Sequence, residues 1–416
     1  MIPVEEALRV ILSRFEPLEP EEVDILEGLG RVLAEDVYSD VDIPPFDNSA
    51  MDGYAVQAAN TEGASTEMPA RLRVVANLAA GHTTDMLVEP GTAIRIMTGA
   101  PLPAGADAVV RFEDTSERLT GRWEEGKQVE VYQEIPLGEH VRPRGEDILR
   151  GELVLPKGTL LRAQEIGVLA SLGRPRLFVI RRPRVGILAT GDELVEIDED
   201  IGPGKIRNSN EYSNAALVKK YGGIPVRLGI ARDRVDELKA RIEEGLAANV
   251  DLFLTSAGVS VGDYDMVKDV LGAEGEMHFW QVKMKPGKPL AFGEVREVPL
   301  IGLPGNPVSA MVSFEQFVRP AILKMLGRSH WEKPTIEVIL DHDVVAGERR
   351  NYLRAIVEPR DDGYHASVVR GPHGSGVLTS MVRANALLIV PEEVTHVRAG
   401  ERLQAQMLDW PEEVAL

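Results

Sequence analysis

Two different spacings of hydrophobic positions divide the chain. Between residues 181 and 327, apolar runs of strand length alternate with stretches in which apolar residues recur at helical spacing. The alternation predicts an α/β domain with a mostly parallel, doubly wound sheet covered on both faces. The predicted strands are Val185–Ala189, Val226–Ile230, Leu252–Thr255, Met277–Val282 and Val298–Leu303, and the predicted helices are 210–221, 234–247 and 307–326.

The segments on either side of this domain contain short apolar runs of strand length and little helical spacing. Runs within 47–140 predict an all-β module, at Arg71–Leu78, Ala93–Met97, Ala108–Phe112 and Gln128–Tyr132. Runs after Gly327 predict a compact β domain, at Thr335–Leu340, Tyr352–Val357, His365–Val369, Ala386–Val390 and Arg402–Met407. Helical spacing predicts an amphipathic helix near Ala7–Phe15, a short helix over 20–26, and a helix over 163–171 that ends at Gly173.

Composition narrows the chemistry. With 416 residues the chain is long enough for several domains, and it contains no cysteine, which excludes disulfides and thiolate catalysis. The eight histidines show no zinc-ligand spacing, so any metal is expected to be a hard cation such as Mg²⁺. A formal charge of −20 argues against nucleic acid and anionic membranes as partners. No signal peptide or membrane-length apolar run is evident, so a cytoplasmic location is expected.

The stretch Thr255–Asp265 is the richest loop of the chain. It follows a buried-strand pattern and brings glycines, hydroxyls and carboxylates together. Glycines let a backbone approach a ligand, and hydroxyls and free N–H groups can hold phosphate or another oxyanion. A surface turn after a strand is the alternative for this loop alone.

Two more loops follow predicted strands at the edge of the sheet where ligands bind in such folds. In the first, Thr190-Gly191-Asp192-Glu193, the two acids are candidates for holding a cation or moving a proton, and a capping turn is the alternative. In the second, Asp233 is placed to cap the helix that begins near residue 234.

The string Pro304-Gly305-Asn306-Pro307 opens the long predicted helix. Asn306 suits an N-cap and Pro307 the first helical position. Exposed N–H groups and the positive end of the helix dipole favour an anion there, and Ser309 adds a hydroxyl. Lys285 and Lys288 lie in an extended Pro- and Gly-containing turn and are expected to supply positive charge to that anion, although lysines are also common on a solvated face.

Two motifs outside the α/β segment also combine acids with glycine. Residues 44–55 contain Asp52 next to Gly53, and residues 142–147 contain Asp147 after two arginines. Either motif alone is typical of a turn.

Together these strings resemble the molybdopterin molybdotransferase family, the MoeA-type proteins. The matching strings are PPFDNSAMDGYAV (44–56), IRIMTGAPLP (94–103), RPRGEDI (142–148), TGDEL (190–194), SAGVSVGDYD (256–265), KPGKP (285–289) and GLPGNPVSA (302–310). They span most of the chain in one order. The C-terminal match is weaker, through residues 351–354 and 374–386.

The resemblance implies an elongated, multidomain α/β plus β subunit in a homodimer. Its parts would be a discontinuous N-terminal linker and dimerisation domain (1–46 and 141–180), an inserted all-β domain (47–140), a molybdopterin-binding α/β domain (181–327) and a C-terminal β-barrel-like domain (328–416). Family members insert molybdenum from molybdate into adenylylated molybdopterin, with Mg²⁺ and release of AMP. The enzyme that adenylylates molybdopterin is the implied partner.

The resemblance also assigns site residues. Asp52, Thr98 and Asp147 would face Glu193, Asp233 and Asp265 of the partner subunit across the dimer, with Mg²⁺ held by Asp52, Glu193 and Asp265. The implied catalytic residues are the five acids Asp52, Asp147, Glu193, Asp233 and Asp265. The implied substrate-binding residues are Thr98, Thr190, Gly191, Asp192, Ser256, Gly258, Ser260, Gly262, Lys285, Lys288, Pro304, Gly305, Asn306, Pro307, Ser309, Arg349, Arg354, Ser375 and Ser380.

One position departs from the family pattern, and two other functions compete. Relatives often carry a lysine where this chain has Gln281, and the side chain of Lys283 is expected on the opposite strand face. One alternative is a scaffold, as in the related protein gephyrin, but no long linker is present. The other is a binding or adenylylating protein built on the α/β domain alone, which would not need residues 1–180 or 328–416. No Walker-type phosphate loop occurs.

Overall fold

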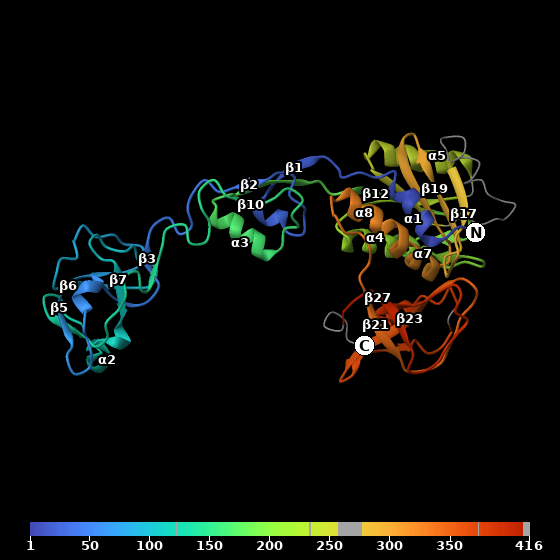
Figure 1. Ribbon diagram of the computed structural model, residues 1–416. Helices are drawn as coiled ribbons and strands as arrows, with labels where there is room; N and C mark the ends of the chain where they lie inside the picture. Colours follow the sequence, from blue (N-terminus) through green and yellow to red (C-terminus); the bar gives the residue numbers. More distant parts are fainter. Residues whose placement is uncertain (122, 233, 257–276, 373, 411–416) are drawn as a thin grey trace. The chain divides into compact units, whose positions relative to one another are not determined.

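The computed structural model describes residues 1–121, 123–232, 234–256, 277–372 and 374–410 (Figure 1). The chain forms two compact units, each described by itself. Unit 1 comprises residues 1–34, 158–163 and 176–416, and unit 2 comprises residues 35–157 and 164–175. Among the described residues, no helix combines the length and apolar character needed to cross a membrane.

A six-stranded sheet organises the α/β part of unit 1. The strand order is β15-β12-β16-β20-β19-β17. The first four strands pair in parallel, and β19 and β17 add antiparallel neighbours at one edge, so the predicted mostly parallel sheet is confirmed. The strands are β12 (Arg184–Thr190), β15 (Ile224–Ala231), β16 (Leu252–Ser256), β17 (Met277–Gln281), β19 (Pro289–Val295) and β20 (Val298–Leu303).

Alternate side chains of these strands enter two different cores. Ile187 joins a large core with α1 (Val4–Leu12), α4 (Ser209–Lys220) and the helices after β20, whereas Leu188 joins a second core with α5 (Val235–Ala247). The two faces are therefore both covered, as a strand periodicity of two requires. The predicted helices 210–221 and 234–247 correspond to α4 and α5.

The long helix predicted from residue 307 runs without interruption through three segments. It consists of α7 (Pro307–Ser313), the π-helical turn η4 (Phe314–Val318) and α8 (Arg319–Met325). Phe314 and Phe317 of the π turn are fully buried in the large core. The extra residue of the π turn therefore lies where the helix packs most tightly.

The C-terminal part of unit 1 is a closed five-stranded barrel. Its strands pair in the order β23-β24-β21-β27-β25, and β25 pairs back with β23. The short strand β18 (Met284–Lys285) from the α/β part adds to the outside of β23. The barrel strands are β21 (Thr335–Leu340), β23 (Arg350–Arg360), β24 (Gly363–Val368), β25 (Ala386–Val390) and β27 (Arg402–Met407), with β22 (Val344–Val345), β26 (His396–Val397) and α9 (Thr379–Val382) between them.

The short helix predicted over 20–26 is wrong. Residues Pro20–Asp24 form strand β1, which pairs antiparallel with β11 (Arg176–Ile180), and only the following residues Ile25–Gly28 form a helical turn, η1. Val23 is the only buried residue of β1. The segment is therefore held by its backbone hydrogen bonds to β11 and not by the buried face of a helix. The partner strand lies about 150 residues away, so local spacing does not reveal it.

Unit 2 contains the predicted all-β module. Its five-stranded sheet has the order β7-β4-β6-β5-β8 and encloses two small hydrophobic cores. Strand β4 lies inside the motif 44–55 and was not predicted as a strand. The elements are β4 (Gly53–Val56), η2 (Ala58–Thr61), β5 (Ala70–Leu78), β6 (Thr92–Ile96), β7 (Ala108–Arg111), η3 (Phe112–Asp114), α2 (Glu117–Thr120) and β8 (Gln128–Val131).

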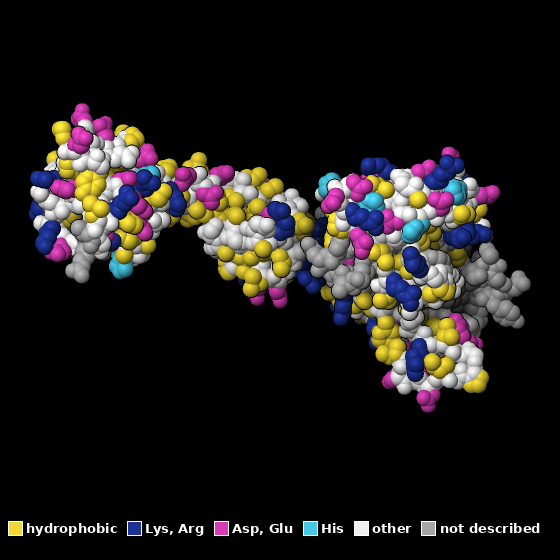
Figure 2. All heavy atoms as spheres, turned by 90° about the horizontal axis from the view of Figure 1, so that it is seen from below, with side chains coloured by type: hydrophobic (Ala, Val, Ile, Leu, Met, Phe, Trp, Pro, Cys, Tyr) yellow, Lys and Arg dark blue, Asp and Glu magenta, His cyan; other side chains and the backbone are white. Residues whose placement is uncertain are grey.

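Two short strand pairs and one helix complete unit 2. The pairs are β2 (Val37–Tyr38) with β10 (Leu153–Leu155), and β3 (Asn48–Ser49) with β9 (Val141–Arg142); the predicted helix α3 (Ala163–Ser171) is confirmed. Figure 2 shows acidic and basic side chains interspersed over the visible face of the β module.

Candidate functional site

A cavity of about 1440 Å³ lies within unit 1, between the carboxyl ends of the sheet strands and the barrel. Its walls come from the loops after β12, β17 and β20, from the end of β16, from the start of α4 and from the barrel segments 342–354, 368–370 and 374–376. Thirteen of the predicted substrate and catalytic residues line it: Thr190, Glu193, Ser256, Lys285, Lys288, Pro304, Gly305, Asn306, Pro307, Ser309, Arg349, Arg354 and Ser375.

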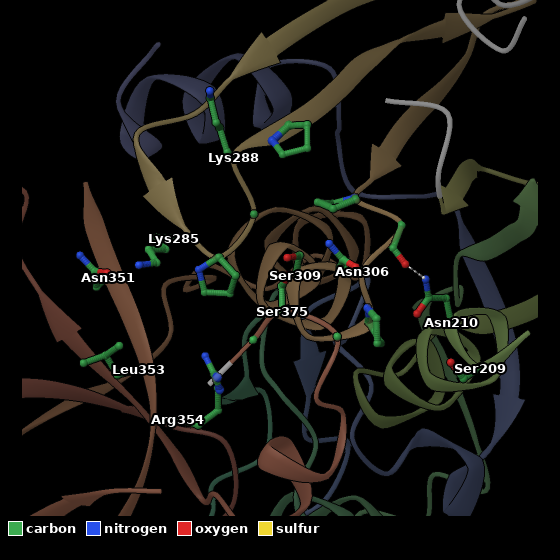
Figure 3. A pocket seen from close by; sticks show the side chains of 18 of the residues that line it. Ser209, Asn210, Lys285, Lys288, Asn306, Ser309, Asn351, Leu353, Arg354 and Ser375 are labelled. Atoms are coloured by element: carbon green, nitrogen blue, oxygen red, sulfur yellow. Dashed lines mark hydrogen bonds between the residues drawn. The ribbon is translucent and has the colours of Figure 1, made fainter. Parts of the chain in front are cut away.

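The start of the 307–325 helix forms the centre of this cavity. Asn306 takes the N-cap position and Pro307 the first helical position, as predicted, but the Asn306 side chain makes no capping hydrogen bond. The carbonyl of Ser375 instead accepts the Val308 N–H at 3.0 Å. Capping therefore does not account for the Asn306 amide, which is exposed and gathers with Ser309 and Ser375 in the middle of the cavity (Figure 3).

A residue that sequence analysis missed holds the turn before this helix. Nδ2 of Asn210 donates to the carbonyl of Gly305 at 2.7 Å (Figure 3). Asn208, two residues earlier, is the N-cap of α4, where its Oδ1 accepts the Glu211 N–H and its Nδ2 donates to the Glu211 carboxylate. The polar run 207–210 before a predicted helix was the available signal, since Asn and Ser favour such positions.

The two lysines of the KPGKP turn line the cavity in different ways. Lys285 belongs to β18 and pairs with Asn351 of the barrel, and Nη1 of Arg349 donates to the carbonyl of Met284 at 3.1 Å. In Figure 3, Lys285 lies beside Asn351, whereas the Lys288 side chain points away from the central group. Gly287 has a φ of +100°, and a Cβ there would contact the Ser313 hydroxyl at 2.6 Å, so the turn requires glycine.

Lys283 and Gln281 do not line the cavity. Lys283 is exposed, while its neighbours Val282 and Met284 are buried in the large core. Alternation places Lys283 and Lys285 on the same side of this segment, so the predicted opposite-face placement does not separate them, but only Lys285 lines the cavity.

The barrel contributes a buried arginine. Arg354 is only 2% exposed, and burial lowers its pKa. Its Nε donates to the Ser380 hydroxyl at 3.1 Å, and that hydroxyl donates in turn to the carbonyl of Val377. Ser380 does not line the cavity, so the structure makes it a support for Arg354 rather than a surface for a ligand.

The TGDEL loop places only part of its predicted set in the cavity. Thr190 and Glu193 line it, whereas Gly191 and Asp192 do not. Gly191 has a φ of +141°, and its missing side chain leaves the space that the Glu193 carboxylate occupies. The carbonyl of Asp192 accepts hydrogen bonds from Lys205 and Arg232, and these bonds hold the backbone of the TGDEL loop in place.

Positive charge dominates the cavity although the chain is acidic. Six cationic side chains line it, namely Arg207, Lys285, Lys288, Arg349, Arg354 and Arg370. The carboxylates of Glu193 and Asp343 are the acidic members. Such a lining favours a ligand that carries phosphate or another oxyanion.

Three predicted residues belong to unit 2. Oδ1 of Asp52 accepts two hydrogen bonds from Thr98, from the backbone N–H at 2.7 Å and the hydroxyl at 2.8 Å. These bonds lower the pKa of Asp52 and keep its carboxylate charged. Asp147 is exposed, and its backbone N–H is held by the carbonyl of Ile43. A single site that joins these residues to the cavity of unit 1 stays a prediction.

Five predicted site residues lie outside the described residues: Asp233, Gly258, Ser260, Gly262 and Asp265. Ser256, the last residue of β16, is described, and its carbonyl accepts a hydrogen bond from the Thr190 hydroxyl at 3.5 Å. Sequence analysis also missed cavity residues of the barrel, including His342, Asp343, Asn351, Leu353, Arg370 and Gly376. Asn351, Leu353 and Gly376 lie within the weaker C-terminal family match but were not named as site residues, and closure of the barrel brings all six residues to one surface.

Comparison with known proteins gives one consistent result. Three family models match: the MoeA N-terminal region (domain I and II) over residues 2–173, a probable molybdopterin-binding domain over residues 186–324, and the MoeA C-terminal region (domain IV) over residues 338–408. A molybdopterin molybdenumtransferase from Nostoc is 39% identical over 389 residues, covering 92% of this chain and 87% of the relative. One from Bacillus subtilis is 35% identical, covering 99% of this chain and 96% of the relative.

A solved structure agrees over the whole length. The crystal structure of the molybdopterin biosynthesis MoeA protein from Pyrococcus horikosii has a TM-score of 0.82 and 34% identity, covering 99% of this chain and all of that chain. These matches extend over nearly the whole chain, and they agree with its motifs, its α/β sheet and its closed C-terminal barrel. The chain belongs to the MoeA family of molybdopterin molybdenumtransferases.

Proposed function

We propose that this protein is a molybdopterin molybdotransferase that inserts molybdenum from molybdate into adenylylated molybdopterin and releases AMP. The observation that carries the proposal is the cationic cavity of unit 1, which residues from four of the seven family strings line around the start of one helix. Both substrates are anionic, and this lining suits them.

The residues of the cavity divide between binding and support. Lys285, Lys288 and Arg354 supply positive charge, and Asn306 and Ser309 supply hydrogen-bond donors beside the start of the helix. Molybdate or the adenylyl phosphate would bind among them, because charged donors in a partly enclosed site stabilise an oxyanion more strongly than water does.

No covalent nucleophile is needed. A water oxygen attacks the adenylyl phosphorus and loses its proton, the bond from that phosphorus to the bridging oxygen breaks, and the molybdopterin phosphate keeps the electron pair while the adenylyl group is released as AMP. If a molybdate oxygen attacks instead, the product is a mixed adenylyl–molybdate anhydride, which water then cleaves to AMP and molybdate. The fixed cations stabilise the charge that develops on the phosphoryl oxygens. Arg354 is held in place for this by Ser380.

Mg²⁺ remains part of the proposal without a demonstrated site. Among residues 1–410 that the structure describes, no three His, Asp or Glu side chains converge to hold a metal ion. Glu193 is the one proposed ligand described in unit 1, and Asp52 belongs to unit 2. We therefore derive no step through Mg²⁺, whose usual contribution would be to neutralise phosphate charge.

The remaining features of the proposal come from the family. We propose a homodimer in which Asp52, Thr98 and Asp147 of one subunit complete the cavity of the other, a cytoplasmic location, and delivery of substrate by the adenylylating enzyme of the same pathway. The ionised state of Asp52 supports a role in holding a cation or a donor group.

The test is to supply the purified protein with adenylylated molybdopterin, molybdate and Mg²⁺. We expect AMP release that depends on molybdate, together with formation of active cofactor. If a folded, dimeric protein neither releases AMP nor forms active cofactor, the enzyme proposal is wrong and the scaffold alternative is favoured. Tight binding of molybdopterin without AMP release would favour the binding-module alternative.

A further inference from the structure

A second, smaller pocket of about 500 Å³ lies at the opposite ends of the two helices that begin at the candidate site. Helix α4 starts with Ser209 at the first cavity and ends at Lys220 beside the second. The 307–325 helix runs in the same way, from Pro307 to the pocket residues Leu323 and Leu326. Nothing in the proposed reaction uses this second pocket.

The pocket gathers cations in a protein with a formal charge of −20. Six of its lining residues are Lys or Arg, and one is an acid, the exposed Glu332; the six are Arg31, Arg182, Lys219, Lys220, Arg319 and Arg328. Arg31 pairs with Glu21, and Lys220 pairs with Asp409. The other four cations face a single carboxylate, which leaves three positive charges in the pocket.

Two of these guanidinium groups have a buried Nε without a hydrogen-bond partner among the described residues. Arg319 is 8% exposed; its Nη1 donates to the carbonyl of Trp331 at 2.9 Å, but its Nε has no hydrogen-bond partner among the described residues. Arg328 donates through Nη2 to the carbonyl of Gly30 at 3.1 Å, and its Nε is likewise buried without a partner there. Burial and the charge of Arg319 lower the pKa of Arg328, so the two groups repel each other.

Helix capping does not account for this charge. The last carbonyls of α4 already accept the N–H groups of Tyr221, Gly222 and Gly223, and those of α8 accept the N–H groups of Leu326, Gly327 and Arg328. The dipoles of two helix ends offset only about one positive charge in total, since each carries roughly −0.5. About two positive charges remain, and water molecules in the pocket would not compensate them with a counter-charge.

The wall of the pocket around Arg319 is held by buried contacts. The Tyr221 ring lies under Arg319, with the guanidinium carbon 5.3 Å from the ring centroid. The Tyr221 hydroxyl donates to the buried Glu315 carboxylate, which also pairs with Lys333 at 2.5 Å. Arg319 is therefore presented on a fixed aromatic surface rather than on a mobile side chain.

We propose that this pocket is a second ligand site, which binds a tetrahedral dianion of the phosphate class through Arg319, Arg328, Arg182 and Lys219. The charge that remains uncompensated matches that of a dianion, and the Nη groups of the guanidinium side chains suit its oxygen atoms. A free oxyanion and the phosphate of a nucleotide share this chemistry. The proposal is independent of the proposed enzymatic function.

The experiment is calorimetric titration with inorganic phosphate at low ionic strength, in the full chain carrying Lys285→Gln and Lys288→Gln to weaken binding at the first cavity. We expect one phosphate per chain in this background. Adding Arg182→Gln and Lys219→Gln, both at exposed positions, should weaken its Kd by at least about 10-fold, the loss expected for two charged donors. Arg398→Gln, an exposed cation outside both pockets, is the matched control and should leave the Kd unchanged.

Titration of the same background with AMP and with molybdate distinguishes the sources. A Kd for AMP at least 10-fold below that for phosphate would identify a nucleotide phosphate as the ligand, and equal or tighter binding of phosphate or molybdate would identify a free oxyanion. Absence of binding by all three anions, or a phosphate Kd that does not change when Arg182 and Lys219 are replaced, would overturn the proposal. A failure of AMP release in the enzymatic assay would not affect it.

Discussion

Thr98 donates both its backbone N–H and its hydroxyl to the same oxygen, Oδ1 of Asp52. The family resemblance gave Thr98 a substrate-binding role, but its polar groups are engaged with the carboxylate. Thr98 therefore acts on any ligand through Asp52, whose ionised form it stabilises.

Replacing Thr98 with Val removes the hydroxyl bond and should raise the pKa of Asp52 toward its ordinary value. The lowered pKa means that Asp52 stabilises the folded state above its unfolded pKa, and that this stabilisation is lost as pH falls through the folded pKa. NMR-detected titration of the Asp52 carboxyl measures the change. Thr98→Ser keeps both donors and should leave the titration in place; an upward shift in that variant as well would contradict the assignment to the hydroxyl.

Glu193→Gln should lower AMP release by on the order of 100-fold, because it removes a carboxylate from the cavity without changing its size. The side chain is outside the hydrophobic cores, so the melting temperature should change little. Gly191→Ala should have a similar effect on activity, since a Cβ there displaces the Glu193 carboxylate. Single-turnover AMP release and thermal unfolding test both variants, and normal activity in Glu193→Gln would remove the residue from the catalytic set.

Lys285→Ala and Lys283→Ala form a matched pair, two positions apart on neighbouring backbone. Lys285 lines the cavity and Lys283 does not, so the first should raise the KM for molybdate by about 10-fold or more and the second by less than 2-fold. Steady-state kinetics with molybdate as the varied substrate gives the comparison. Equal effects would show that Lys283 reaches the site and compensates for Gln281.

Lys333→Met should destabilise unit 1 by about 3–5 kcal/mol, because it leaves the buried Glu315 carboxylate without its charged partner. The two side chains are 7% and 3% exposed. Urea denaturation followed by tryptophan fluorescence measures the loss. The double variant Lys333→Met with Glu315→Leu should recover most of it, and a double variant as unstable as the single one would point to packing around Tyr221 as the cause.

The barrel should contain one pH-sensitive contribution to stability. His365 bonds to Asp341 and Asp362, and these carboxylates raise the pKa of its imidazole. The stabilisation is fully present below the unfolded His pKa of about 6.5 and is lost as pH rises through the folded value. Melting temperatures of the wild type and of His365→Gln at several pH values test this; their difference should shrink from pH 5.5 to pH 8.5, and a constant difference would exclude the protonated imidazole.

Local sequence was sufficient where local physics decides the structure. The helix after Asn306-Pro307 begins where capping and proline geometry place it, and the alternation of Ile187 and Leu188 gave a strand buried on both sides. The prediction from local sequence failed where pairing with a distant segment determines the structure. Residues 20–24 form a strand because Arg176–Ile180 supplies the other half of a ladder, which no local pattern contains.

The same distinction applies to the candidate site. The lysine turn, the helix start and the TGDEL loop were predictable because each has its own motif. The contact of Asn210 with Gly305 and the pairing of Lys285 with Asn351 in the barrel wall were not predictable. The first joins segments 95 residues apart and the second joins segments 66 residues apart, and both pairs meet only after folding.

Strand β18 has a consequence for how the positive charge of Lys285 reaches the cavity. Lys285 sits in a turn of the α/β part, but the backbone that carries it is hydrogen-bonded into the barrel sheet beside Arg350 and Asn351. The barrel sheet therefore holds the backbone of Lys285, and residues 327–334 connect that barrel to the α/β part. A change in the length of this connection should alter the affinity for molybdate although every charged residue of the cavity is retained.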